Sequence, residues 1–252
     1  MSFHVLMYHE LRERGAIGES APSVVEVATN CDAALPKMLF AYVDDFEKQM
    51  DMLQSGGFNV ISMQDVRDFY EKGKTLPENA VLITFDDAFQ SVLRYAYPVL
   101  KKRGLHATLF VVRGWLAKTA KRFNPEKSVV MSVSEVNEMR DVFTFANHTT
   151  DLHDQDGAKS TFQTATTAEL LADLKTCAEF VDEPDIFAYP FGAYGEADLE
   201  RLQQAGIKLA FTTKPGRNER ETPPLELHRQ VVALGMTAEE LKQILHKDGK
   251  EN

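Results

Sequence analysis

The chain has 252 residues, of which 44% are hydrophobic and 26% are charged, as in an ordinary soluble globular protein. Its formal net charge of −10 argues against nucleic acid as a partner and against adsorption to an anionic membrane, because both require a basic surface. No run of about 20 apolar residues occurs, so no insertion into a membrane is expected.

Short apolar runs alternate with amphipathic stretches along the whole chain. The runs of strand length are residues 3–8, 58–61, 80–85, 107–112, 142–146, 186–188, 208–213 and 230–234. Helical periodicity is found between them, at residues 43–56, 63–72, 89–103, 133–140, 167–180, 196–205 and 237–246.

This alternation predicts the fold class. Strands that are apolar throughout, such as residues 81–83, indicate parallel strands that are buried on both faces. At this length we expect a single α/β domain over residues 1–252, a distorted or incomplete (β/α) barrel of about seven parallel strands. An open doubly wound sheet gives the same pattern and stays an alternative. Residues 12–42 fit neither pattern and are expected to form a long loop excursion over the barrel mouth or to be partly disordered.

Polar residues follow several predicted strands, at the edge where parallel β/α folds place their chemistry. His9 follows the first strand, Asp86 and Asp87 follow the third, and His148 and His153 follow the fifth. Because these strand ends meet at one mouth, we expect the five side chains to lie together.

The adjacent carboxylates Asp86 and Asp87 repel each other and are poorly solvated at the end of a buried strand. A divalent cation would compensate for this if one Asp were a ligand and the other stayed ionised as a general base for a water molecule. Alternatively, the pair caps the helix predicted to start at residue 89.

The other candidates also have two interpretations. His148 and His153 with one carboxylate would make a three-ligand metal site that leaves positions open for water and substrate, or they are hydrogen-bonded loop residues. His9 is either a partly buried residue at a strand end or the acid that protonates a leaving amine. Trp115, a few residues after the strand at 107–112, is either a packing residue or a platform for a sugar ring.

Two motifs, TFDD at residues 84–87 and NHTTDLH at residues 147–153, resemble the polysaccharide deacetylases of carbohydrate esterase family 4, or NodB-homology domain. Within it, the chain is most similar to bacterial poly-β-1,6-N-acetylglucosamine deacetylases of biofilm formation. YHE at residues 8–10 opens the chain, whereas most members carry the catalytic-acid His near the C-terminus. The His-to-His spacing is one residue longer than usual, and the third motif is YPFG at residues 189–192. Ala88 stands where the first motif usually has Gly. The resemblance extends from residue 3 to about residue 245.

The resemblance implies a metal centre. Asp87, His148 and His153 would bind one divalent metal, and Asp86 would be the general base that activates the attacking water. Thr149 would support the metal loop. The metal would be zinc, although family members also accept cobalt or nickel, and the ligand types alone do not discriminate between these ions.

The resemblance also implies roles around the metal. His9 would protonate the departing amine. Phe191 and Tyr189 of the third motif would contact the substrate, with the backbone N–H of Phe191 on the tetrahedral oxyanion. Ala188 stands where most members carry the Arg that orients the base, and we hypothesise that Arg229 from the last strand replaces it.

The implied activity is hydrolytic removal of N-acetyl groups from an N-acetylglucosamine-containing glycan, with the poly-β-1,6 type favoured. The same centre would also suit deacetylation or deformylation of peptidoglycan, chitin oligosaccharide or a small amido sugar. A non-catalytic glycan-binding relic of the fold is the alternative from another class. The complete set of ligands, base and acid argues against a relic, which has no reason to keep them.

The first ten residues lack the basic and apolar regions of a signal peptide, so the chain as it stands is expected to be cytoplasmic. A chain from which an export signal had been removed would read the same and would be extracellular or at the cell surface. The sequence does not specify the oligomeric state.

Overall fold

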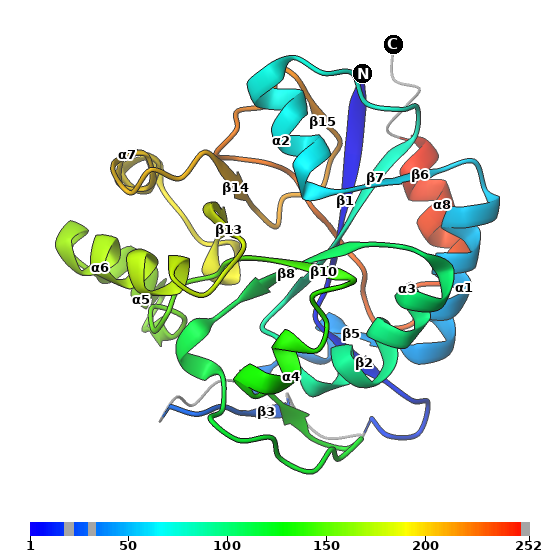
Figure 1. The fold of residues 1–252 in the computed structure, drawn as a ribbon, viewed down its shortest axis with the longest axis horizontal. Helices are drawn as coiled ribbons and strands as arrows, with labels where there is room; N and C mark the ends of the chain where they lie inside the picture. Colours follow the sequence, from blue (N-terminus) through cyan, green and yellow to red (C-terminus); the bar gives the residue numbers. More distant parts are fainter. Residues whose placement is uncertain (18–22, 30–33, 248–252) are drawn as a thin grey trace.

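The computed structural model describes residues 1–17, 23–29 and 34–247. Its main sheet has the strand order β14-β13-β10-β8-β7-β1-β15, and each of these pairings is parallel except that of β15 with β1 (Figure 1). The strands are β1 (Ser2–Tyr8), β7 (Ala80–Asp86), β8 (Ala107–Val111), β10 (Phe143–Asn147), β13 (Glu183–Ala188), β14 (Leu209–Phe211) and β15 (Asn218–Glu219).

Two further strands complete the sheet. β6 (Asn59–Ile61) pairs with the first half of β7, and β16 (Gln230–Val231) pairs in parallel with β1. Just before β16, Leu227 forms a parallel bridge with Phe211 of β14. Residues 227–231 therefore contact β14 at one end of the sheet and β1 next to its other end, and the sheet is a curled half-barrel. This confirms the predicted distorted barrel, and the sheet is not an open doubly wound one.

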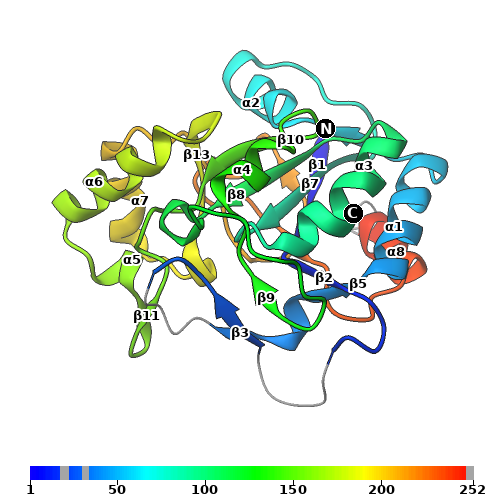
Figure 2. The ribbon, with the colours of Figure 1, turned by 60° about the horizontal axis from the view of Figure 1, so that its bottom comes forward.

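Helices pack against the outside of the curled sheet (Figures 1 and 2). They are α1 (Val43–Ser55), α2 (Met63–Lys72), α3 (Tyr97–Arg103), α4 (Val133–Asn137), α5 (Thr161–Thr164), α6 (Thr167–Ala178), α7 (Glu196–Gln204) and α8 (Ala238–Lys247). Short 3-10 turns lie at Lys37–Leu39, Arg113–Trp115 and Pro190–Gly192, and a π-helical turn at Val92–Ala96 precedes α3. Each helix predicted from periodicity is present. The one predicted at 89–103 is divided into the π turn and a shorter α-helix.

Alternation along the strands positions the site. Phe3 and Val5 of β1 and Leu82 of β7 belong to one buried cluster inside the sheet, while the residues between them pack under the helices. Continuing the same two-residue period brings Asp86 and His9 to the inner face at the mouth. The apolar interior therefore ends in polar side chains.

The predicted excursion at residues 12–42 contains short strands in its described parts. β2 (Glu10–Arg12) pairs with β5 (Phe40–Tyr42), and β3 (Ser23–Glu26) pairs with β4 (Ala34–Leu35) and β9 (Ser128–Val129). Residues 18–22 and 30–33 of this stretch lie outside the described residues. A hairpin of β11 (Gln155–Asp156) and β12 (Lys159–Ser160) borders the site. Among the described residues, no helix has the length and apolar character needed to cross a membrane.

Candidate metal and active site

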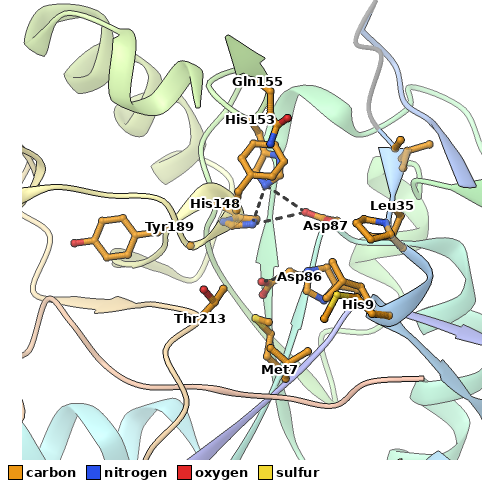
Figure 3. Close-up of a pocket in the computed structure, with 18 of the residues that line it drawn as sticks. Met7, His9, Leu35, Asp86, Asp87, His148, His153, Gln155, Tyr189 and Thr213 are labelled. Atoms are coloured by element: carbon orange, nitrogen blue, oxygen red, sulfur yellow. Dashed lines mark hydrogen bonds and ion pairs between the residues drawn. The ribbon is translucent and has the colours of Figure 1, made fainter. Parts of the chain in front are cut away.

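A cavity of about 560 Å³ opens at the carboxyl ends of β1, β7 and β10 (Figure 3). Its lining includes all five polar residues expected at the mouth, His9, Asp86, Asp87, His148 and His153. Apolar side chains of the excursion, such as Leu35 and Met38, also line the cavity. Residues of β3 and of the segment 34–39 thus contribute to the wall of the cavity.

Asp87, His148 and His153 converge on one point. The Nε2 atoms of His148 and His153 lie 3.7 and 3.6 Å from Asp87 Oδ1, and 3.1 Å from each other (Figure 3). All three side chains are buried, and Asp87 Oδ1 has no hydrogen-bond partner among the described residues. Two imidazole nitrogens and an unpaired carboxylate oxygen, each within 4.8 Å of the others, fit a divalent cation that keeps open coordination positions.

The protonation states of the cluster suit a metal. His148 Nδ1 lies 2.7 Å from the carbonyl oxygen of Ala188 and donates to it, which leaves the Nε2 lone pair facing Asp87. Burial lowers the pKa of both His148 and His153 below the ordinary value of 6.5, which favours the neutral rings that metal ligands must be. Burial and the charge of Asp86 raise the pKa of Asp87, and a bound cation would reverse that shift.

Asp86 stays ionised although it is buried. Burial alone would raise its pKa, but Arg229, His148 and His9 lower it to about 2. Arg229 Nη1 donates to Asp86 Oδ1 at 2.7 Å, and Arg229 Nε donates to the carbonyl of Thr212 at 2.9 Å. The segment that bridges the sheet ends thus supplies a fixed, buried counter-charge to the carboxylate.

His9 lies beside Asp86. Its Nε2 is 3.9 Å from Asp86 Oδ2, and its Nδ1 has no hydrogen-bond partner among the described residues. Burial lowers the pKa of His9 to about 4, although the charge of Asp86 opposes this. The candidate acid and the candidate base are neighbours because β1 pairs with β7.

Unusual backbone conformations concentrate around the cavity. Of the five described non-glycine residues with positive φ, four lie here: Asp87 (71°), Ala88 (59°), Thr149 (75°) and Phe191 (59°). The fifth is Asn79, a residue type that adopts this conformation readily. A left-handed conformation costs a residue with a Cβ roughly 1–2 kcal/mol, so the surrounding contacts must hold these turns in place.

Contacts that the sequence did not indicate hold the loop at residues 148–153. Asn147 Oδ1 accepts from the backbone N–H of Thr149 at 2.9 Å. The carboxylate of Asp173, on α6, accepts from the backbone N–H groups of residues 150–152 at 2.7–3.2 Å. Asp173 belongs to no motif and is one of many charged residues on helices, so only the tertiary structure identifies it.

The three residues predicted to contact the substrate lie in different positions relative to the candidate metal ligands. Trp115 is only 4% exposed and its ring meets that of His153 edge-on at 4.7 Å, which fits packing better than an open stacking platform. The Tyr189 hydroxyl donates to the carbonyl of Leu225 and points away from the cluster, so its side chain does not reach the reacting centre (Figure 3). Phe191 is 47% exposed and its ring lies 4.8 Å from that of His153, at the mouth.

A half-barrel of parallel strands with a two-histidine, one-carboxylate cluster and a separate ionised carboxylate at its mouth is typical of metal-assisted hydrolases. The family profile described as Polysaccharide deacetylase matches residues 73–210, more than half of the chain. The chain belongs to the polysaccharide deacetylase family, as the sequence motifs predicted.

Two curated relatives agree with this assignment. The chain is 29% identical over 195 residues to YxkH of Bacillus subtilis, a match that covers 77% of this chain and 66% of that protein. It is also 29% identical over 175 residues to the poly-β-1,6-N-acetyl-D-glucosamine N-deacetylase of Staphylococcus aureus strain MSSA476, covering 66% of this chain and 59% of that protein. The matches thus span less than two thirds of these curated relatives.

The fold is shared with two solved structures. The Streptococcus pyogenes deacetylase PplD, solved in complex with acetate, superposes with a TM-score of 0.74 at 23% identity, covering 97% of this chain and 98% of that one. IcaB from Ammonifex degensii gives a TM-score of 0.72 at 24% identity and covers 97% of both chains. At these levels of identity, both similarities show a shared fold.

Replacing Arg229 by Met should lower the free energy of unfolding by about 3–5 kcal/mol at pH 7, because it leaves the charge of Asp86 buried without its partner. The folded-state pKa of Asp86, about 2, lies below the ordinary value of 3.8, so its ionisation stabilises the fold above pH 3.8. That contribution is lost as the pH falls towards 2. Urea denaturation in the presence of a chelator measures the difference.

The double variant Arg229→Met/Asp86→Asn removes both charges and should recover a substantial part of the lost stability. A single variant as stable as the wild-type protein would contradict the proposed dependence of Asp86 on Arg229.

Proposed function

We propose that the protein is a metal-dependent N-deacetylase that hydrolyses the acetamide groups of an N-acetylglucosamine glycan. The observation that carries this proposal is the convergence of Asp87, His148 and His153 next to an Asp86 carboxylate that Arg229 keeps ionised. One group of residues is suited to hold a cation and the other to take up a proton, and amide hydrolysis requires both.

A divalent cation held by Asp87 Oδ1 and the two Nε2 atoms would act as a Lewis acid towards the acetamide carbonyl. Zinc suits this ligand set, and cobalt and nickel are compatible with it. Arg229 occupies Asp86 Oδ1, which leaves Oδ2 to accept the proton of the attacking water. His9 Nε2 lies 3.9 Å from that same oxygen, so the neutral imidazole would receive the water proton from Asp86 and pass it on to the departing amine.

Arg229 is proposed to take the place of the motif-three Arg that Ala188 lacks. In support, its guanidinium is 1% exposed and has a second fixed contact at Thr212, so the carboxylate is oriented as well as ionised. The backbone N–H of Phe191, at the mouth beside His153, is the proposed donor to the oxyanion that forms during attack.

The proposed substrate is poly-β-1,6-N-acetylglucosamine or its oligomers. The staphylococcal relative is named for this polymer, and the family acts on polysaccharides. Among the described residues that line the cavity, Arg229 is the one side chain with a permanent positive charge, and Asp86 neutralises it. A neutral acetylated glycan suits such a cavity better than an anionic one.

Metal analysis of the purified protein should find about one divalent cation per chain, and His148→Ala should remove it. His106→Ala, at an exposed position outside the cavity, serves as the control and should retain the metal. A wild-type protein that binds no zinc, cobalt or nickel, and whose stability does not change in chelator, would rule the proposal out.

Asp86→Asn should lower the rate of acetate release by about 10²–10⁴-fold while the metal stays bound, because the amide cannot accept the water proton. Asp51→Asn, at an exposed position on α1, is the matched control and should have wild-type activity. Acetate release from β-1,6- and β-1,4-linked N-acetylglucosamine oligomers is the assay, and the β-1,6 series should be faster.

Faster release from the β-1,4 series would reassign the substrate to a chitin-like or peptidoglycan-like glycan. Metal binding without acetate release from any oligomer would support the glycan-binding relic.

A further inference from the structure

Two of the three candidate metal ligands belong to one irregular loop. His148 directly follows β10 and His153 precedes β11, and residues 149–152 between them are neither helix nor strand. Thr149 in this loop has a φ of 75°. The relative position of the two imidazoles therefore depends on whatever holds the loop.

The two histidines are held in different ways. His148 is oriented by its own hydrogen bond from Nδ1 to the carbonyl of Ala188. His153 Nδ1 is buried and has no hydrogen-bond partner among the described residues, and its ring contacts those of Trp115 and Phe191. The directed contact of this imidazole is the one between its Nε2 and His148 Nε2, at 3.1 Å on the side that would face the metal. No hydrogen bond fixes the ring from its Nδ1 side, so the orientation of His153 depends on its backbone.

The carboxylate of Asp173 supplies directed contacts to that backbone. Its Oδ1 accepts from the N–H of Thr150 at 2.8 Å, and its Oδ2 accepts from the N–H groups of Asp151 and Leu152 at 2.7 and 3.2 Å. The Thr150 hydroxyl also donates to the backbone carbonyl of Asp173 at 2.8 Å. Hydrogen bonds to a charged acceptor are about twice as strong as neutral ones, and these three serve consecutive residues.

The opposite side of the loop is also closed. The backbone N–H of Gly114 donates to the carbonyl of Thr150 at 2.9 Å. A Cβ at Gly114 would lie 2.0 Å from Asp151 Oδ1 and 2.6 Å from that same carbonyl, so only glycine fits there. The loop is held between this turn and α6, with Asp173 as the charged contact on the α6 side.

We propose that Asp173 is a positioning residue for the metal centre, because its carboxylate fixes the loop backbone that orients His153 towards His148 and Asp87. The inference rests on the proposed metal function. Asp173 does not touch the metal, the substrate or the reacting atoms. Its contribution is to keep the third ligand in place before the cation arrives.

Asp173→Ala should raise the zinc dissociation constant by about 10–100-fold, the usual effect of losing a residue that supports metal ligands. Asp173→Asn should have an intermediate effect, because its amide keeps one acceptor oxygen but presents N–H donors to the remaining loop N–H groups. Competition with a chromophoric zinc chelator measures the constants. In the cobalt-loaded protein, the visible absorption bands should change in Asp173→Ala.

Glu169→Ala is the matched control on the same helix. Glu169 accepts from the backbone N–H and hydroxyl of Thr166 at the start of α6 and has no contact with the metal loop among its hydrogen bonds. The Glu169→Ala substitution should lower the melting temperature of the metal-free protein, because it removes the hydrogen bonds at the start of α6. It should leave the zinc dissociation constant and the cobalt absorption bands unchanged.

Wild-type zinc affinity in Asp173→Ala would overturn the positioning role and leave the metal site itself standing. An equal loss of affinity in Glu169→Ala would also overturn it, since the effect would then come from helix stability. If Asp173→Ala does not fold, the same decision rests on Asp173→Asn, for which wild-type affinity refutes the proposal. A wild-type protein that binds no metal would refute the proposed function and this inference together.

Discussion

Two adjacent carboxylates at the end of a buried strand cannot both be ionised without compensation, and this constraint organises the site. Asp86 is compensated by a buried guanidinium, which holds its pKa at about 2. Asp87 has no such partner, and its pKa is raised by burial and by Asp86. Two neighbouring residues of the same type are therefore suited to opposite tasks, one to remain a free base and the other to be neutralised by a cation between His148 and His153.

The backbone makes this division possible. Neighbouring side chains of a regular strand point to opposite faces, yet Asp86 and Asp87 both line the cavity. The positive φ values of Asp87 and Ala88 end the strand period and turn the second carboxylate back towards the mouth. Thr149 makes a comparable turn directly after His148. The conformational strain at these residues is offset by contacts from the surrounding elements, such as the hydrogen bonds that Asp173 accepts from the backbone N–H groups of residues 150–152.

Much of the fold and the central residues of the site could be predicted from the sequence. Apolar runs and helical periodicity mark the elements, and chemistry at strand ends is a rule of parallel β/α folds, so Asp86, His148 and His9 could be found. The direction of a side chain that follows a strand end depends on tertiary contacts. The same is true of hydrogen bonds between a loop and a helix that is distant in the sequence. For that reason the sequence could not indicate that the Tyr189 hydroxyl turns away from the cluster, or that Asp173 holds the loop.

The position of residues 227–231 near the C-terminal end of the sequence affects the order in which the parts of the site are synthesised. The chain is synthesised from its N-terminus, so the candidate ligands and both carboxylates leave the ribosome before Arg229 does. A nascent chain, or one that terminates before this residue, has no guanidinium opposite Asp86 and no strand joining β14 to β1. The counter-charge of the base therefore arrives in the same short segment that joins the two ends of the sheet. Biosynthesis thus couples the arrival of this counter-charge to the arrival of the strand that joins β14 to β1.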